Sequence, residues 1–227
     1  MTKLLQEKKY CSGCGACFSI CPKNAIRMEE DNCGFSYPYV DFEKCVSCNL
    51  CKKVCSFSTN EINNKDFEFP VCFGAIHKNK RVIKNSRSGG AFSAISDWVL
   101  EKDGVVYGAC LCEDFVTRHI RASTKQQRDL LRKSKYVQSD TNDSFNQVEN
   151  DLKNGKWVLY SGTGCQCDGL RMFLLCKKID ISKLLLVDII CHGISSPKVL
   201  KDYLEFEEIK NKRKLKNFEF RTKDLFQ

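Results

Sequence analysis

A repeated cysteine pattern near the start of the chain constrains its fold more than any other feature. The first run is Cys11, Cys14, Cys17 and Cys21, and the second, with identical spacing, is Cys45, Cys48, Cys51 and Cys55. Two-residue gaps let one short loop place three thiolates around an iron–sulfur cluster, so the fourth ligand must come from elsewhere. A zinc site usually uses two well-separated Cys-x-x-Cys pairs. The repeat therefore favours two 4Fe–4S clusters over zinc.

The ligand assignment follows from the bacterial two-cluster ferredoxins, which residues 10–57 resemble. In those proteins the last cysteine of each run binds the cluster of the other run. Cluster one would then take Cys11, Cys14, Cys17 and Cys55, and cluster two would take Cys45, Cys48, Cys51 and Cys21. This crossed arrangement would hold the two clusters close together, as electron transfer between them requires.

The composition of the chain indicates its cellular location and the kind of partner it would bind. Residues 1–10 are polar and basic, and the chain has no apolar run long enough for a signal peptide or a transmembrane helix. Sixteen cysteines without such a leader indicate metal ligation in a reducing compartment, so we expect a cytoplasmic protein. The simplest interpretation of the net charge of +9 is solvated helix faces. A functional patch is the alternative; without a nucleic-acid-binding motif it would favour a redox partner protein or subunit, or a phosphorylated coenzyme, over nucleic acid.

The pattern along the chain predicts two domains. We expect a ferredoxin domain of the α+β class over residues 1–60, a polar linker over 61–70, and an α/β domain with a mainly parallel sheet over 71–227. Apolar runs predict strands, and apolar periodicity and capping residues predict helices. The expected strands cover 34–40, 71–76, 105–107, 157–160 and 184–190; the expected helices cover 91–100 and begin near Thr124, Ser144, Gly164 and Ser196.

Four short motifs in the second domain carry a family resemblance. They are Ser88-Gly89-Gly90-Ala91-Phe92, Ser134-Lys135-Tyr136-Val137-Gln138-Ser139, Gly162-Thr163-Gly164-Cys165-Gln166, and Cys191-His192-Gly193 with Ser196-Pro197. Each alone is weak, but in this order behind a two-cluster ferredoxin block they resemble the coenzyme F420 hydrogenase/dehydrogenase beta-subunit family. The first motif opens the expected helix at 91–100, and the third and fourth follow the expected strands at 157–160 and 184–190. The carboxyl ends of strands are where parallel α/β sheets build their ligand sites.

The resemblance implies a flavin, usually FAD, beside the clusters. By analogy the flavin-site candidates are Ser88, Gly89, Gly90, Lys135, Thr163 and Gln166. The glycines and Thr163 suit phosphate contacts, and Lys135 would place positive charge near the reduced ring. His192 is a candidate proton donor, with an ordinary hydrogen-bonding histidine as the alternative. Some family members carry a third 4Fe–4S cluster, for which Cys165 and Cys191 are candidates; the alternative is that they are buried free cysteines.

The expected function is an iron–sulfur flavoprotein oxidoreductase, or a subunit of one. It would pass electrons between two 4Fe–4S clusters and a flavin that exchanges hydride with an organic substrate or a deazaflavin-type coenzyme. The alternative is a non-catalytic electron-transfer or adaptor subunit whose second domain docks to a partner. Two departures from the family pattern motivate that alternative: Gly164 stands where the family commonly has proline, and the sequence stops in what resembles a mid-domain strand. We therefore expect a truncated or split second domain.

Overall fold

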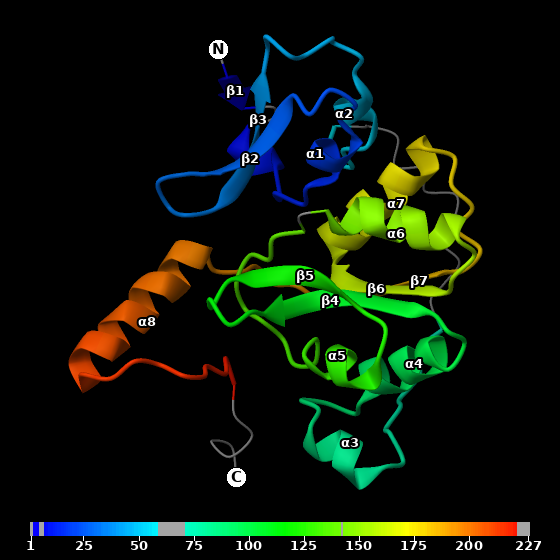
Figure 1. Ribbon diagram of the computed structural model, residues 1–227, viewed down its shortest axis with the longest axis vertical. Helices are drawn as coiled ribbons and strands as arrows, with labels where there is room; N and C mark the ends of the chain where they lie inside the picture. Colours follow the sequence, from blue (N-terminus) through cyan, green and yellow to red (C-terminus); the bar gives the residue numbers. More distant parts are fainter. Residues whose placement is uncertain (1, 5–6, 59–70, 142, 222–227) are drawn as a thin grey trace.

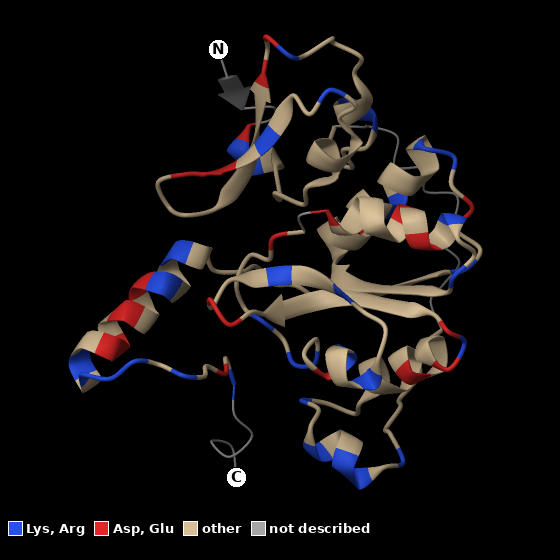
Figure 2. Ribbon diagram, in the orientation of Figure 1, with Lys and Arg blue, Asp and Glu red and all other residues tan. Residues whose placement is uncertain are grey.

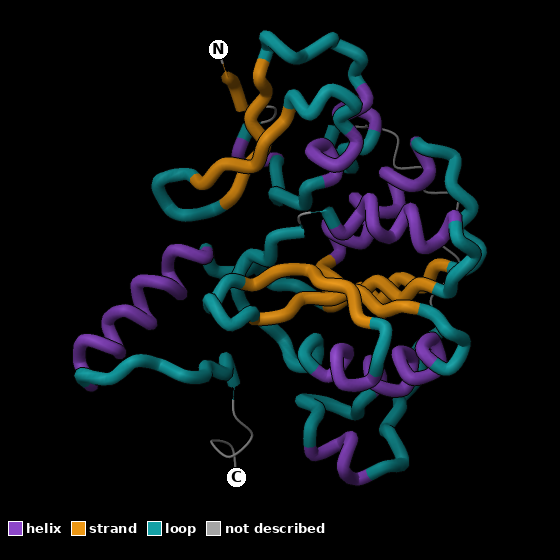
Figure 3. The backbone as a smooth tube through the Cα atoms, in the orientation of Figure 1, coloured by secondary structure: helices purple, strands orange, loops and turns teal. Residues whose placement is uncertain are grey.

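The computed structural model describes residues 2–4, 7–58, 71–141 and 143–221. Its small N-terminal part lies above a larger sheet-and-helix part in Figure 1. A three-stranded antiparallel sheet of order β1-β3-β2 supports two short helices and a 3₁₀ turn. The elements are β1 (Thr2–Leu4), η1 (Lys8–Tyr10), α1 (Ala16–Ile20), β2 (Ile26–Glu30), β3 (Ser36–Asp41) and α2 (Leu50–Lys53). Figure 3 shows the cysteine loops beside this sheet as irregular chain.

The second part is built on a four-stranded sheet of order β5-β4-β6-β7. Strands β4, β6 and β7 are parallel, and β5 pairs antiparallel with β4 through a tight hairpin. The strands are β4 (Val105–Leu111), β5 (Thr117–Ala122), β6 (Val158–Thr163) and β7 (Leu184–Ile189). The expected fold class, a ferredoxin-like α+β part followed by an α/β part with a mainly parallel sheet, is confirmed.

Helices cover both faces of this sheet (Figure 1). Helices α4 and α5 lie on one face, whereas α6 and α7 lie on the other, between the sheet and the N-terminal part. Helix α8 projects to one side, and α3 packs at the far end. Their bounds are α3 (Lys80–Lys84), α4 (Ala91–Leu100), α5 (Lys125–Asp129), α6 (Ser144–Lys153), α7 (Gly164–Cys176) and α8 (Pro197–Asn211).

Several helix starts obey the capping rules that the sequence indicated. The Thr124 hydroxyl accepts a hydrogen bond from the backbone N–H of Gln127, and Ser196 caps α8 with Pro197 at its first position. Helix α6 instead has Asp143 at its N-cap, one residue before the predicted position. Beyond its first turn, each helix is held in place by the packing of its apolar face against the core.

One predicted strand is wrong. Residues 71–76 form no strand, and Val71, Phe73 and Ile76 are all exposed. Among the described residues, no strand pairs with this run, and the backbone bond nearest to it runs from the His77 N–H to the Gly89 carbonyl. Cys72 in this run is likewise exposed. The predicted linker over 61–70 lies outside the described residues.

The two parts share one hydrophobic core. Ala16, Ile20 and Val54 from the cysteine loops are buried against Phe145 and Phe173 of α6 and α7. Burial of apolar surface is the main stabilising contribution to folding, so each part covers apolar surface of the other. Each part also has an apolar cluster of its own, around Ile26 and Val40 in the N-terminal part and around Val106 and Leu159 in the other. The predicted domain boundary at residues 60–71 therefore stays a prediction, and the two parts pack through a shared apolar interface.

Candidate functional site

The two cysteine loops adopt the same backbone conformation. In the first loop Gly13 and Gly15 have positive φ angles of 66° and 82°, and the equivalent residues of the second loop, Ser47 and Asn49, have 54° and 59°. A short helix begins directly after each second position, α1 after Gly15 and α2 after Asn49. The sequence repeat is therefore also a structural repeat, with its cysteines at matching turns.

The first loop needs glycine because it lies against the α/β part. A Cβ on Gly13 would lie 2.5 Å from the Gln138 side-chain nitrogen and from the Ser36 carbonyl oxygen, and one on Gly15 would lie 2.4 Å from the Thr141 hydroxyl oxygen. The second loop is exposed, so Ser47 and Asn49 fit there in spite of their left-handed backbone. The two copies share a left-handed backbone, and they differ in that the first loop lies in close contact with its neighbours, where a side chain would clash.

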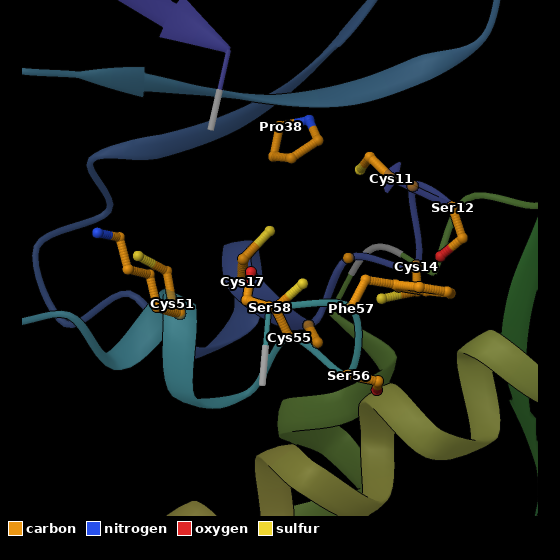
Figure 4. A pocket seen from close by; sticks show the side chains of 14 residues that line it. Cys11, Ser12, Cys14, Cys17, Pro38, Cys51, Cys55, Ser56, Phe57 and Ser58 are labelled. Carbon is orange, nitrogen blue, oxygen red and sulfur yellow. The ribbon is translucent and has the colours of Figure 1, made fainter. Parts of the chain in front are cut away.

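The cysteines fall into two spatial groups. Figure 4 shows Cys11, Cys14, Cys17 and Cys55 around one hollow beneath Pro38. Burial raises the pKa of each of the three thiols of the first loop, and the neighbouring charges that add to these shifts include Cys55. Burial likewise raises the pKa of Cys51, and its charged neighbours are Cys48, Cys21 and Cys45. The structure thus brings Cys55 to the first loop and Cys21 to the second.

The two groups differ in their access to solvent. Cys17 is buried and Cys14 is half-buried, and burial raises the pKa of the Cys14 thiol to about 11. In the other group Cys48 is exposed and Cys21, Cys45 and Cys51 are half-buried. Within the described residues, no three metal-ligating side chains converge as tightly as a single metal ion requires. Thiols spread around a hollow suit a bulky cluster better than one zinc ion with ~2.3 Å bonds.

A second, larger cavity opens at the carboxyl ends of the parallel strands. It encloses about 1440 Å³, including its open mouth, and residues at the ends of β4, β6 and β7 line it. All six flavin-site candidates line it as well: Ser88, Gly89, Gly90, Lys135, Thr163 and Gln166. Segments from distant parts of the sequence therefore meet at one edge of the sheet, where parallel α/β sheets place their ligands.

The Ser88-Gly89-Gly90 turn leads directly into α4. Gly90 is the N-cap and has a φ of 83°, which glycine adopts without strain. A Cβ on Gly89 would lie 2.4 Å from the Ala75 carbonyl oxygen, so the turn can sit against residues 75–76 only with glycine at this position. Free backbone N–H groups at the N-terminus of a ten-residue helix suit a phosphate group.

The loop after β6 is internally bonded. The Thr163 N–H and the Thr163 hydroxyl both donate to the Gln166 side-chain oxygen, at 3.1 Å each. These two side chains therefore cap α7 while they line the cavity. Gly164, the departure from the family pattern, is the first residue of α7; a Cβ there would lie 3.1 Å from the Asp188 carboxylate.

Lys135 is half-buried on the cavity wall. Its ammonium group donates to the carbonyls of Leu130 and Arg132. Burial lowers its pKa from 10.5 to about 8, with a further lowering by Lys133 and opposing effects from Cys110 and Cys112. The side chain therefore carries a positive charge at neutral pH that is shared with no carboxylate.

The sequence analysis missed a second buried titratable group, His119. It lines the cavity, its Nδ1 lies 2.8 Å from the Ser139 hydroxyl oxygen, and its Nε2 lies 3.2 Å from the Ser161 carbonyl oxygen. Because only a ring N–H can bond that carbonyl, Nε2 holds the proton and Nδ1 accepts from Ser139. Burial lowers its pKa to about 4, so the ring is neutral near pH 7. Period-two alternation could have marked His119 as inward-facing.

The candidate proton donor His192 lies elsewhere. It is exposed and is absent from the described residues that line the cavity. Cys165 lines the cavity, and its charge influences Cys11 and Cys14, whereas Cys191 is exposed. The proton-donor and third-cluster assignments therefore remain predictions, and the placement of Cys165 ties it to the first cysteine group.

Hydrogen bonds join the N-terminal part to the segment that carries Gln138 and Thr141. The Gln138 side chain accepts from the Ser36 N–H at 2.7 Å and donates back to the Ser36 carbonyl at 3.2 Å, as a neighbouring strand would. The Thr141 hydroxyl donates to the Cys14 carbonyl at 3.2 Å. Ser12 and Gly13 line both the cysteine hollow and the larger cavity, so the two spaces are adjacent.

Comparison with known proteins decides the family. Residues 10–59 match the 4Fe-4S dicluster domain, and residues 155–227 match the C-terminal domain of the coenzyme F420 hydrogenase/dehydrogenase beta subunit. The chain carries a 4Fe-4S dicluster domain and a C-terminal domain of this beta-subunit family. The predicted family is confirmed, and so is the presence of two 4Fe–4S clusters in this iron–sulfur electron-transfer chain.

Individual relatives of this beta-subunit-family chain cover only parts of it. It is 34% identical over 53 residues to an uncharacterized ferredoxin of Methanocaldococcus jannaschii, which is 23% of this chain and 68% of the relative. It is 32% identical over 66 residues to a trichloroethene reductive dehalogenase of Dehalococcoides mccartyi, which is 25% of this chain and 12% of that enzyme.

Among solved structures, a chain of the F420-reducing [NiFe] hydrogenase complex from Methanosarcina barkeri is similar, with a TM-score of 0.46 and 21% identity. The similarity covers 57% of the present chain, which thus spans about half, 47%, of the solved chain. Within the described residues of the beta-subunit-family chain, no helix is both long and apolar enough to cross a membrane.

Proposed function

We propose that this chain is an oxidoreductase subunit that moves electrons between two 4Fe–4S clusters and a flavin, most simply FAD, held in the larger cavity. The observation that carries the proposal is the convergence of all six flavin-site candidates on one cavity that adjoins the first cysteine loop. The flavin would supply two-electron hydride chemistry with an organic substrate or coenzyme, and the clusters one-electron transfer.

The residues present fit both groups. Eight thiols in two groups suit two clusters, with Cys55 assigned to cluster one and Cys21 to cluster two. Gly89 and Gly90 let the turn before α4 pack against residues 75–77, at the N-terminus of a ten-residue helix, where backbone N–H groups suit a phosphate. Lys135 would hold positive charge at the cavity wall, and neutral His119 would keep Ser139 and the end of β6 in place.

Burial supports an order for the electron path. Cys48 is the exposed cysteine of the second group and Cys17 the buried one of the first, and the first group adjoins the cavity through Ser12 and Gly13. Cluster two would therefore exchange electrons with a partner protein, and cluster one would exchange them with the cavity. Gln138, which lines the cavity, and the nearby Thr141 would hold the N-terminal part in place through their bonds to Ser36 and Cys14.

The surface over the second cysteine loop supports a protein partner. Phe42 and Val46 are exposed beside Cys48, and α2 ends in Lys52 and Lys53, which colour its end blue in Figure 2. An apolar patch with a basic rim suits an acidic redox protein or subunit, because opposite charges steer association.

The proposal is tested by anaerobic purification of the full chain followed by absorbance, iron analysis and flavin extraction, before and after incubation with FAD. We expect about eight irons and about one FAD per chain after reconstitution. Full iron content without any bound flavin would contradict the enzyme proposal and favour the adaptor alternative. One observation favours that alternative: the outer face of α8 exposes Val199, Tyr203, Phe206 and Ile209, as a docking helix would.

The lowered pKa of Lys135 makes a separate prediction. Because this lysine loses its proton near pH 8, the affinity for FAD should fall as the pH rises from 7 to 9, by up to about tenfold for one charge contact. Fluorescence titration measures it. In Lys135→Met the affinity should be low at both pH values. Lys183→Met, whose lysine bonds the distant Gly155 carbonyl, should keep the wild-type profile.

The lowered pKa of Lys135 also predicts how the free energy of unfolding changes with pH. The folded chain binds the Lys135 proton less tightly than the unfolded chain does, so the free energy of unfolding should rise with pH between about 8 and 10.5. Lys135→Met should lack this rise. Equal pH profiles for Lys135→Met and wild type, in both binding and unfolding, would show that Lys135 does not titrate in this range.

A further inference from the structure

The mouth of the larger cavity is strongly basic. Arg87, Arg132, Lys133 and Lys135 all line it, and none of the described lining residues is acidic. A concave wall of one charge sign attracts ligands of the opposite sign. Arg87 comes from the turn before α4, and the other three come from the segment after α5. These two segments are far apart in the sequence but line the same cavity.

A single carboxylate from a distant segment bridges two of these residues. One Glu219 oxygen accepts from the Arg87 guanidinium at 2.7 Å, and the other accepts from the Lys133 ammonium group at 2.5 Å. Both bonds connect parts of the chain that are far apart in sequence. Lys133 has a φ of 70°, a left-handed backbone conformation that lysine rarely adopts because it is strained.

The segment that carries Glu219 is held by its neighbours. Phe218 and Phe220 pack edge to face at 4.9 Å, and they belong to a cluster with Val137, Leu200 and Leu204. Glu219 itself stays partly exposed between these aromatic anchors. Its side chain can therefore leave Arg87 and Lys133 while the segment remains packed.

Glu219 lines a smaller hollow that adjoins the cavity and shares Arg87 and Lys133 with it. We infer that Arg87 and Lys133 form a binding subsite for a phosphate or pyrophosphate group between these two spaces, which Glu219 occupies as an internal anion. Two cationic groups that each contact one oxygen of a carboxylate can contact two oxygens of a phosphate in the same way. A phosphorylated ligand would displace the Glu219 side chain and take both contacts. The inference deepens the proposed function, because it assigns the position of a ligand phosphate in the same cavity.

Binding of inorganic pyrophosphate to the full, cluster-loaded chain tests this, measured by isothermal titration. Glu219→Gln removes the competing charge and should raise pyrophosphate affinity about threefold to tenfold, as for one or two partly exposed ion pairs. Glu219→Asp, which shortens the carboxylate, should raise it less. The double variant Arg87→Ala with Lys133→Ala should lower the affinity at least about tenfold.

The matched control is Asp202→Asn, which removes the same charge from an exposed ion pair with Lys198 on α8. It should leave pyrophosphate affinity unchanged. An equal rise in Glu219→Gln and Asp202→Asn would mean a general charge effect and overturn the subsite. So would equal affinity of the wild type and the double variant. If FAD fails to bind while the Glu219→Gln effect on pyrophosphate persists, the subsite stands and the flavin assignment fails.

Discussion

Replacement of Cys55 by alanine is expected to abolish cluster one and leave cluster two intact, although Cys55 belongs to the second run. Iron content should fall from about eight to about four per chain. Cys55 and Cys51 both line the hollow of the first loop, but they have different neighbours. Cys55 influences the pKa of Cys11, Cys14 and Cys17, whereas the pKa of Cys51 is influenced by Cys48, Cys21 and Cys45. Iron analysis with low-temperature paramagnetic resonance of the reduced protein measures the outcome.

Two double variants identify which cluster is lost. Cys55→Ala with Cys14→Ala should cost one cluster, and Cys55→Ala with Cys48→Ala should cost both. If each run instead served its own cluster, the two results would be exchanged. Cys33→Ala, an exposed cysteine outside both runs, is the matched control and should keep all the iron.

Replacement of Gly89 by alanine is expected to lower FAD affinity by more than about tenfold. The added methyl group would lie 2.4 Å from the Ala75 carbonyl oxygen, so the turn before α4 must move away from residues 75–76. The backbone N–H groups that we assign to phosphate binding would move with it. FAD titration and the flavin content after desalting are the measurements.

The control for this change is close in sequence. Gly74→Ala introduces the same methyl group where nothing lies within 4 Å, so it should retain wild-type flavin binding. Because Gly89 does not have a positive φ, the alanine variant suffers the clash without additional backbone strain. Wild-type flavin content in Gly89→Ala would place the phosphate away from this turn.

Local patterns predicted the features that depend on local rules. Thiolate spacing indicates two clusters because the ligands of each loop are neighbours in sequence, and Thr124 and Ser196 predict helix starts because a cap bonds its own first turn. The apolar periodicity of residues 91–100 also gave the bounds of α4, since a helix buries one face wherever it packs.

The features that sequence reasoning missed depend on distant contacts. Residues 71–76 have strand composition but no pairing partner, and pairing is what makes a strand. His119 becomes part of the site only because β5 folds back beside β4 and brings it to the end of β6. The Glu219 bridge to Arg87 spans 132 positions in the chain, which no local pattern can indicate.

The core shared by Ala16, Ile20 and Val54 with α6 and α7 has a consequence for how this chain can be divided. A fragment that ends after the second cysteine run would expose the apolar surface that α6 and α7 cover in the full chain. The remaining fragment would expose the apolar surface of those two helices. Swapping the electron-carrying piece for that of another protein would require redesign of this seam.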